Sequence, residues 1–233
     1  MGKQLKGLLY FFIMDIRYSL LIFWTILLGI LAVSIAFSYF LLSVEDGRFF
    51  FGFPFAIYVY CAILGFLMVK DSIPFALKIG ATRKNIFVSF GLFFLLLAFA
   101  KAVVANLLQT LISFFTESAG IHTFNFLHLA NLMENTWLNR VIIDGAVMFF
   151  LLSAMFMLGL LFYKYGLAGG GSVAGILVVV LLLGIAQGWI FDFFIDVFAS
   201  IDVLFFYQLL GVGIVLYGLT FVLVRKITIL KVK

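Results

Sequence analysis

Residues 91–100 read GLFFLLLAFA and residues 176–185 read ILVVVLLLGI, and neither run contains a polar or charged side chain. Strands of membrane β-barrels alternate apolar and polar residues, whereas these two runs are apolar on every face. Helices and closed barrels are the architectures that span a bilayer, because each satisfies its own backbone hydrogen bonds. The two runs therefore predict membrane-spanning helices.

The composition of the whole chain supports this interpretation. Of its 233 residues, 66% are hydrophobic and 11% are charged, and the mean hydropathy is +1.30. Soluble domains are about 45–50% apolar and about 25% charged. We predict a single all-α integral membrane domain over residues 1–233, with six transmembrane helices of roughly 20 residues each. The predicted spans are 20–43, 53–69, 86–114, 141–163, 173–191 and 203–224.

The charged residues sort by side of the membrane. With a cytoplasmic N-terminus, the inner segments hold twelve Lys and Arg residues against two Asp residues. The outer segments hold Arg48 and Arg140 against eight acidic residues, Asp144 among them. Short cytoplasmic loops carry an excess of Lys and Arg. We therefore predict that both termini are cytoplasmic, and the net charge of +5 does not indicate a nucleic-acid partner.

Two segments outside the spans have patterns of their own. Residues 1–17 place apolar residues at helical spacing among Lys3, Lys6 and Arg17, which is typical of an amphipathic helix lying in the membrane interface. Residues 115–140 are the longest external segment, and their Leu and Phe content predicts a helix on or dipping into the outer leaflet.

Motifs for nucleotide chemistry and catalysis are not found in the sequence. The glycine-rich run 166–175, GLAGGGSVAG, has no lysine to reach a phosphate and no βαβ context, so we expect close helix packing or a flexible turn there. His122 and His128 have no standard metal-ligand spacing, and we expect them to be interfacial polar residues. Cys61 has no disulfide partner and is expected in the core. We predict no catalytic, cofactor or metal site in this chain.

The turn between the second and third predicted spans is the most informative segment. Residues 73–87 read IPFALKIGATRKNIF. Pro74 is placed where a helix can begin, Gly80 where it can end, and Thr82 where it can cap the next helix. This predicts a short amphipathic cytoplasmic helix within 70–85. Such a helix suits a groove on another protein, and the alternative is a basic turn anchored to anionic headgroups.

This segment resembles the P-x-x-x-x-x-G-x-[ST]-R-[KR] turn of bacterial ABC exporter permeases of the type-two class, some of which export amphipathic or antimicrobial peptides. The resemblance implies a multi-pass subunit of the bacterial plasma membrane that pairs with a second permease subunit and with a separate ATP-binding subunit, which holds ATP and Mg²⁺. It also implies a re-entrant or short helical element on the outer side, for which residues 188–202 are the candidate. The coupling residues it implies are Ile73, Pro74, Phe75, Leu77, Lys78, Gly80, Thr82, Arg83 and Lys84.

Polar residues inside the third predicted span are candidates for a substrate path. Asn106, Gln109, Thr110 and Ser113 fall on one stripe of a helix, and polar groups in hydrocarbon face protein or water rather than lipid. Hydrogen bonding between helices is the alternative role. Lys101 lies roughly 20 Å into the span at 1.5 Å per residue, so we expect a partner or water beside it, in a structural or a gating role.

The outer side carries an acidic cluster of Asp192, Asp196 and Asp202, which suits a cationic ligand, although solvated loop acids are the simpler interpretation. From the resemblance, we expect an ATP-driven exporter subunit for an amphipathic peptide, lipid or drug that is not itself an enzyme. The rival hypotheses are a membrane scaffold or an immunity protein that sequesters a peptide without ATP. An intramembrane enzyme is disfavoured, since no catalytic pair recurs at a common depth.

Overall fold

The structure, a computed structural model, describes residues 2–44, 47–199 and 201–227 and is nearly all helical there. Five of its helices are long and apolar enough to cross a membrane. The helices are α1 (Gly2–Phe40), η1 (Leu41–Ser43), α2 (Phe53–Lys78), α3 (Arg83–Ser118), η2 (Leu129–Leu132), α4 (Trp137–Gln187), α5 (Trp189–Ala199) and α6 (Val203–Arg225), and the strands are β1 (Phe49–Phe51) and β2 (Phe124–Phe126).

The first helix differs from its prediction. We expected residues 1–17 to form a separate interfacial helix, but α1 runs without interruption from Gly2 to Phe40. The apolar stripe of its N-terminal part packs against protein, because Leu8, Phe12 and Ile16 are buried and Phe12 stacks on Phe90 of α3 with ring centroids 4.3 Å apart. Spacing alone does not say whether an apolar stripe faces lipid headgroups or another helix, and here it faces α3.

The turn between α2 and α3 is partly as predicted. Gly80 has a left-handed φ of 77° just after α2, and the Thr82 side chain accepts a hydrogen bond from Asn85 N at the start of α3. The prediction of a separate short helix within 70–85 is wrong, since α2 continues through Pro74 to Lys78. Proline is tolerated in membrane helices where neighbouring groups satisfy the freed carbonyl. Residues 70–78 therefore extend α2 beyond the predicted span.

The segment between α3 and α4 contains a strand that the sequence analysis missed. We expected a helix within 115–140, but β2 pairs in parallel with β1, with Phe49 opposite Phe124 and Phe51 opposite Phe126. Aromatic and alternating side chains suit a pleated strand, and the ring centroids of Phe49 and Phe124 are 6.2 Å apart. The two loops at this end of the bundle are thus joined by backbone hydrogen bonds.

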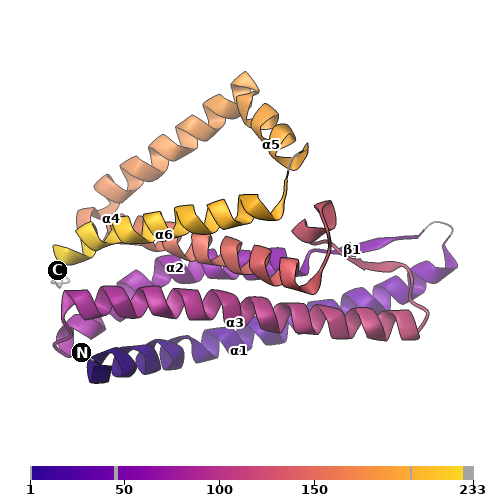
Figure 1. Cartoon of the computed structure of the whole chain (residues 1–233), viewed down its shortest axis with the longest axis horizontal. Coiled ribbons are helices and arrows are strands. Elements are labelled where there is room, and N and C mark those ends of the chain that lie inside the picture. Colours follow the sequence, from indigo (N-terminus) through magenta and orange to yellow (C-terminus); the bar gives the residue numbers. More distant parts are fainter. Residues whose placement is uncertain (1, 45–46, 200, 228–233) are drawn as a thin grey trace.

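The fourth helix has two arms. Gly166 breaks it with φ 68° and ψ −166°, a conformation favoured by glycine. The arm after Gly166 leaves the bundle and leads to α5, which turns back toward α6 (Figure 1). The predicted span 173–191 crosses the end of α4 at Gln187 and the left-handed Gly188, so its boundary is wrong. The short helix α5 lies within 188–202, where a short helical element was expected.

The core of the bundle is aromatic. Phe90 and Phe94 of α3 pack against Phe156 of α4, with ring centroids 4.9 and 5.2 Å away, and Tyr217 of α6 stacks on Phe87 at 4.8 Å. Helices α2 and α4 approach closely at Gly65, where an added Cβ would lie 2.6 Å from the Leu152 carbonyl oxygen. Small residues permit such approach between membrane helices. This packing fixes the relative positions of α2, α3 and α4, which carry the site described below.

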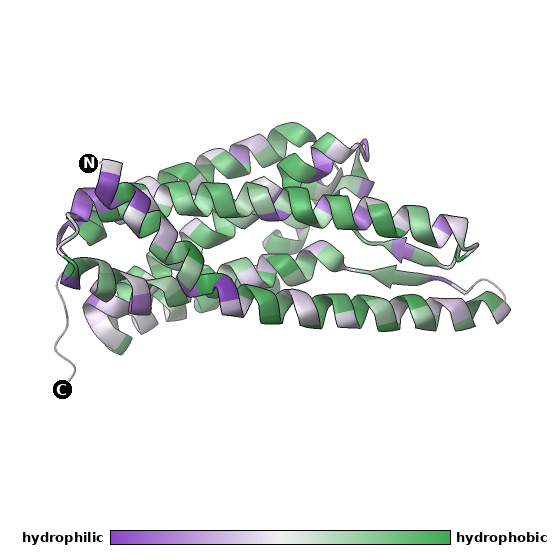
Figure 2. Ribbon diagram, turned by 90° about the horizontal axis from the view of Figure 1, so that it is seen from below, coloured by the Kyte–Doolittle hydropathy of each residue, from purple (hydrophilic) through white to green (hydrophobic). Residues whose placement is uncertain are grey.

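One end of the bundle gathers the start of α1, the α2–α3 turn and the end of α6 (Figure 1). Asn85 Nδ2 donates to Gln4 Oε1 at 2.6 Å, and Arg83 donates to the Ile227 carbonyl oxygen at 3.0 and 3.2 Å. Hydrophilic residues concentrate at this end, while the helices are largely apolar along their lengths (Figure 2). The β1–β2 pair lies at the opposite end.

Candidate functional site

A buried carboxylate joins three helices and the segment that follows β2. Asp144 of α4 is 1% exposed. Its Oδ1 accepts a hydrogen bond from the Tyr58 hydroxyl of α2, and its Oδ2 accepts one from Asn106 Nδ2 of α3 at 2.7 Å. His128 Nε2 lies 3.2 and 3.3 Å from the two carboxylate oxygens. We call Tyr58, Asn106, His128 and Asp144 the Asp144 cluster.

The local fold determines which ring nitrogen of His128 carries the proton. Its side chain caps η2, because Nδ1 accepts a hydrogen bond from Ala130 N at 2.9 Å. An imidazole nitrogen that accepts a backbone N–H carries no proton, so the proton of the ring lies on Nε2 and points to Asp144. The carboxylate thereby receives three donors, which is what a buried charge requires.

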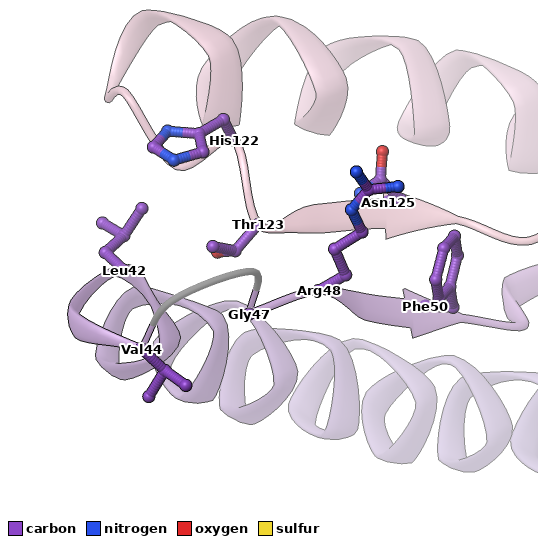
Figure 3. A pocket seen from close by; sticks show the side chains of 8 residues that line it. All are labelled: Leu42, Val44, Gly47, Arg48, Phe50, His122, Thr123 and Asn125. Carbon is purple, nitrogen blue, oxygen red and sulfur yellow. The ribbon is translucent and has the colours of Figure 1, made fainter.

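Two polar hollows are lined in part by residues of β2. One, shown in Figure 3, has a volume of about 430 Å³, and the other, which we call the α3–α4 cavity, has a volume of about 530 Å³. His122 and Asn125 border both hollows. Besides these two, the α3–α4 cavity is lined by Gln109, Ser113, Thr116, Glu117, Ile121, Phe124, Phe126, Asn131, Asn135 and Arg140.

The hollow in Figure 3 is lined by residues of η1, the β1 segment and the β2 segment. Arg48 precedes β1, and its guanidinium points toward Asn125 of β2, while Leu42 lies at the other end of the hollow (Figure 3). The Thr123 side chain is held by α1, because its hydroxyl donates a hydrogen bond to the Ser38 carbonyl oxygen at 2.6 Å. Arg48 therefore lies in the neighbouring hollow and does not line the α3–α4 cavity.

Lys101 is buried in a different environment. It is 3% exposed, and within the described residues its Nζ has no hydrogen-bond partner. Nζ lies over the ring of Tyr60 at 3.6 Å from the centroid and over that of Phe23 at 4.9 Å. Such cation–π contacts stabilise a cation by about 0.5–2 kcal/mol. Lys101 thus contacts α1 and α2 and does not line the α3–α4 cavity.

The structure divides the predicted polar stripe of α3. Asn106 belongs to the Asp144 cluster, and Gln109 and Ser113 line the α3–α4 cavity. Thr110 is exposed, and its hydroxyl donates to the Asn106 carbonyl oxygen of its own helix at 2.8 Å. The stripe therefore serves two environments, one structural and one open to solvent or ligand.

The predicted coupling residues also separate by exposure. Ile73 is fully buried, and Arg83 is engaged by the Ile227 carbonyl oxygen. Phe75 is 39% exposed and stacks on Phe11 of α1 with centroids 3.9 Å apart. Pro74 and Leu77 are half-buried, and the exposed members of the predicted set are Phe75, Lys78, Gly80, Thr82, Arg83 and Lys84.

The three acids of the predicted outer cluster lie on two elements. Asp192 and Asp196 are exposed one turn apart on α5, and the Asp202 side chain caps α6 by accepting from Phe205 N at 3.0 Å. Among the described residues, no group of three or more His, Cys, Asp or Glu side chains is placed to hold a metal ion.

Sequence reasoning missed the centre of the site. Asp144 was counted among the external acids and His128 among interfacial residues, but both are buried and bonded to each other. Tyr58 and Arg140 were not singled out. An available signal was that Asp144 lies inside the predicted span 141–163, where an ionisable residue is itself a functional-site hypothesis.

No family model, no curated protein and no solved structure matches this chain. The site is therefore interpreted from its own residues.

Proposed function

We propose that this chain is the membrane-spanning subunit of an ATP-driven bacterial exporter that moves an amphipathic peptide, lipid or drug out of the cell. In this proposal the chain dimerises with a second permease subunit in the plasma membrane. It couples to a separate ATP-binding subunit that holds ATP and Mg²⁺. The observation that carries the proposal is the α2–α3 turn, where the permease-like motif coincides with an exposed, basic protrusion.

The exposed side chains of the turn suit a protein groove. Phe75 and Ile79 are 39% and 57% exposed, and the exposed Lys78 lies between them and the exposed Lys84 lies after them in the chain. Apolar anchors flanked by charges are typical of a docked helix. Because the turn continues α2 and begins α3, a force on it acts directly on two helices that hold the Asp144 cluster.

The length of α4 supports a six-span topology. At 1.5 Å per residue its 51 residues are about 76 Å long, more than twice the thickness of a hydrocarbon core. We propose that the arms on either side of Gly166 cross separately, which gives six spans with both termini in the cytoplasm.

The proposal is tested by affinity purification from the native membrane in mild detergent. The parent is compared with the Lys78→Glu/Lys84→Glu variant, which reverses two exposed charges of the turn and leaves Arg83 and its contact with Ile227 in place. Lys6→Glu, an exposed reversal at the same end of the bundle, is the matched control.

We expect an ATP-binding subunit to co-purify with the parent and the control and to be reduced at least tenfold with the double variant. If a folded, monodisperse parent brings no such subunit, the exporter proposal fails and the scaffold or immunity hypothesis takes its place. Equal recovery of an ATP-binding subunit with all three chains would show that the partner exists but does not dock on the α2–α3 turn.

A further inference from the structure

The α3–α4 cavity exposes polar groups that the protein leaves unused. Gln109 is 4% exposed and faces the cavity, yet within the described residues its amide makes no hydrogen bond to protein. The Nε atom of Arg140 is buried and has no partner there either. Buried polar groups in native proteins are almost always paired, so the Nε atom of Arg140 points to a ligand that completes it, and the Gln109 amide is open to the same cavity.

The lining of the α3–α4 cavity contains one basic and one acidic side chain. Arg140 is the one Lys or Arg that borders the cavity, and Glu117 is the one Asp or Glu. Neither side chain forms an ion pair within the described residues, although both line the same cavity. A simple anion would pair with Arg140 but be repelled by Glu117. A simple cation would pair with Glu117 but be repelled by Arg140. A zwitterion satisfies both.

The remaining lining selects the kind of cation. Ser113, Glu117 and Asn125 offer hydroxyl, carboxylate and amide oxygens, and within the described residues none of these side chains is engaged in a hydrogen bond. A primary ammonium has three N–H donors for such acceptors, whereas a quaternary ammonium has none. On the anionic side, Arg140 has the planar fork that suits phosphate.

The surroundings of the cavity are apolar. Phe114 and Phe115, next to Ser113 on α3, are 71% and 59% exposed, and Leu138, near Arg140 on α4, is 61% exposed. In a chain with this many apolar helices, such side chains face acyl chains. A ligand with a polar head in the cavity and apolar tails along α3 and α4 matches both surfaces.

The Asp144 cluster holds the cavity in shape. Gln109 follows Asn106 by three residues on α3, and Arg140 precedes Asp144 by four on α4, so each cavity residue lies about one turn from a member of the cluster. Asp144 is hydrogen-bonded by three other groups, and its charge also acts on Arg140 one turn away. The volume of about 530 Å³ is within the usual range for small-molecule sites, about 300–1,000 Å³.

We propose that the α3–α4 cavity binds the zwitterionic headgroup of an aminophospholipid, with the phosphate on Arg140 and the primary ammonium on Glu117. Binding here requires neither nucleotide nor a partner subunit. The inference therefore stands or falls independently of the coupling role of the α2–α3 turn.

The test measures binding of short-chain lipids with identical acyl chains to the purified full chain in detergent, by isothermal titration calorimetry. The probes are phosphatidylethanolamine, phosphatidylcholine, phosphatidylglycerol and soluble phosphoethanolamine. We expect the parent to bind the ethanolamine lipid at least tenfold more tightly than the other two lipids. Phosphoethanolamine should compete with it but bind more weakly. If phosphoethanolamine binds as tightly as the lipid, the membrane source is overturned and the ligand is soluble.

Variants assign the two charges. Glu117→Gln should remove the preference for ethanolamine over choline, because the ammonium loses its carboxylate. Arg140→Gln should weaken all three lipids at least tenfold, and Arg140→Lys should restore part of that loss. Arg48→Gln, which removes the arginine of the neighbouring hollow, is the matched control and should bind as the parent does.

Thermal unfolding of each variant separates binding from folding. If Arg140→Gln lowers the melting temperature, its weaker binding could come from partial unfolding. The other two variants then test the binding site itself. Arg140→Lys keeps the positive charge, and Glu117→Gln changes an exposed residue at the end of α3. Equal affinity of the parent for the three lipids, or parental binding by a folded Glu117→Gln variant, overturns the proposal.

Discussion

Asp144 and Lys101 are single charges of opposite sign, both buried among the helices and held in different ways. The Asp144 carboxylate receives hydrogen bonds from Tyr58 and Asn106 and pairs with His128. The Lys101 ammonium lies over the faces of Tyr60 and Phe23, with the Cys61 thiol also nearby. The first arrangement satisfies the charge by geometry, and the second leaves three N–H donors without an acceptor in the described residues. We infer that the first stabilises the fold and that the second is retained at a cost to stability.

The largest effect is expected from Asp144→Ala. The substitution leaves the donors of Tyr58, Asn106 and His128 without their shared acceptor. Each buried unsatisfied donor costs about 1–3 kcal/mol, so we expect a loss of about 3–5 kcal/mol. The free energy of unfolding in mixed detergent–SDS micelles, followed by circular dichroism, measures this loss. Glu134→Ala, an exposed acid near the same end of α4, is the control and should be neutral. A loss below about 1 kcal/mol for Asp144→Ala would contradict the stabilising role.

Lys101→Met is expected to act in the opposite direction. Methionine fills a similar space, and a charge at the centre of a membrane helix costs at least about 2.5 kcal/mol on insertion scales. We therefore expect the same unfolding measurement to show a gain of about 2 kcal/mol. Lys70→Met, an exposed lysine of α2, serves as the comparison. A destabilised Lys101→Met variant would mean that the ammonium is well paired and that the two charges are held alike.

Tyr58→Phe tests one of the hydrogen bonds that the Asp144 carboxylate accepts. The change removes the hydroxyl donor and keeps the ring, and hydrogen bonds between membrane helices average about 0.6 kcal/mol with a maximum near 1.7. Because this bond is to a carboxylate, we expect a loss of about 1 kcal/mol. Tyr39→Phe, whose hydroxyl lies on an exposed residue, should change nothing. No difference between the two variants would show that Asn106 and His128 suffice for Asp144.

The smallest effect is expected in a double-mutant cycle between Tyr60→Leu and Lys101→Met. If the Tyr60 ring holds the ammonium, Tyr60→Leu should cost more in the parent than in the Lys101→Met background, by about 0.5–1 kcal/mol. The four free energies of unfolding give the coupling directly. Additive changes would remove the cation–π contact as an explanation for the placement of Lys101.

The apolar helices were predictable because length and composition suffice to identify them. The predicted spans 53–69, 86–114, 141–163 and 203–224 each fall inside a helix of the structure. The C-terminal end of α2 was not predicted, because Pro74 was interpreted as a helix start and only packing shows that α2 continues past it. The three-residue strands were missed because FFF and FNF, lying between longer apolar runs, carry too little periodicity to identify a strand.

The site was predictable only in its α3 half. Asn106 and Gln109 were found since polar residues stand out in an apolar helix. Asp144 was counted with the external acids although it lies three residues inside the predicted span 141–163, where a shift of a few residues decides between water and protein. His128 was expected at the membrane interface because it lies in the external segment 115–140. Their pairing with each other and with Tyr58, 86 positions from Asp144, depends on packing that no local pattern encodes.

The parallel pairing of β1 with β2 has a consequence for biosynthesis. Phe49 and its partner Phe124 are 75 positions apart, with α2 and α3 between them. At roughly 5–20 residues per second, a ribosome takes about 4–15 s to add that length of chain. The first loop must therefore wait, with the backbone groups of β1 unpaired, until the whole second hairpin has been made. A chain that stalls within α3 presents to the quality-control machinery an open strand edge, which is a template for pairing with other chains.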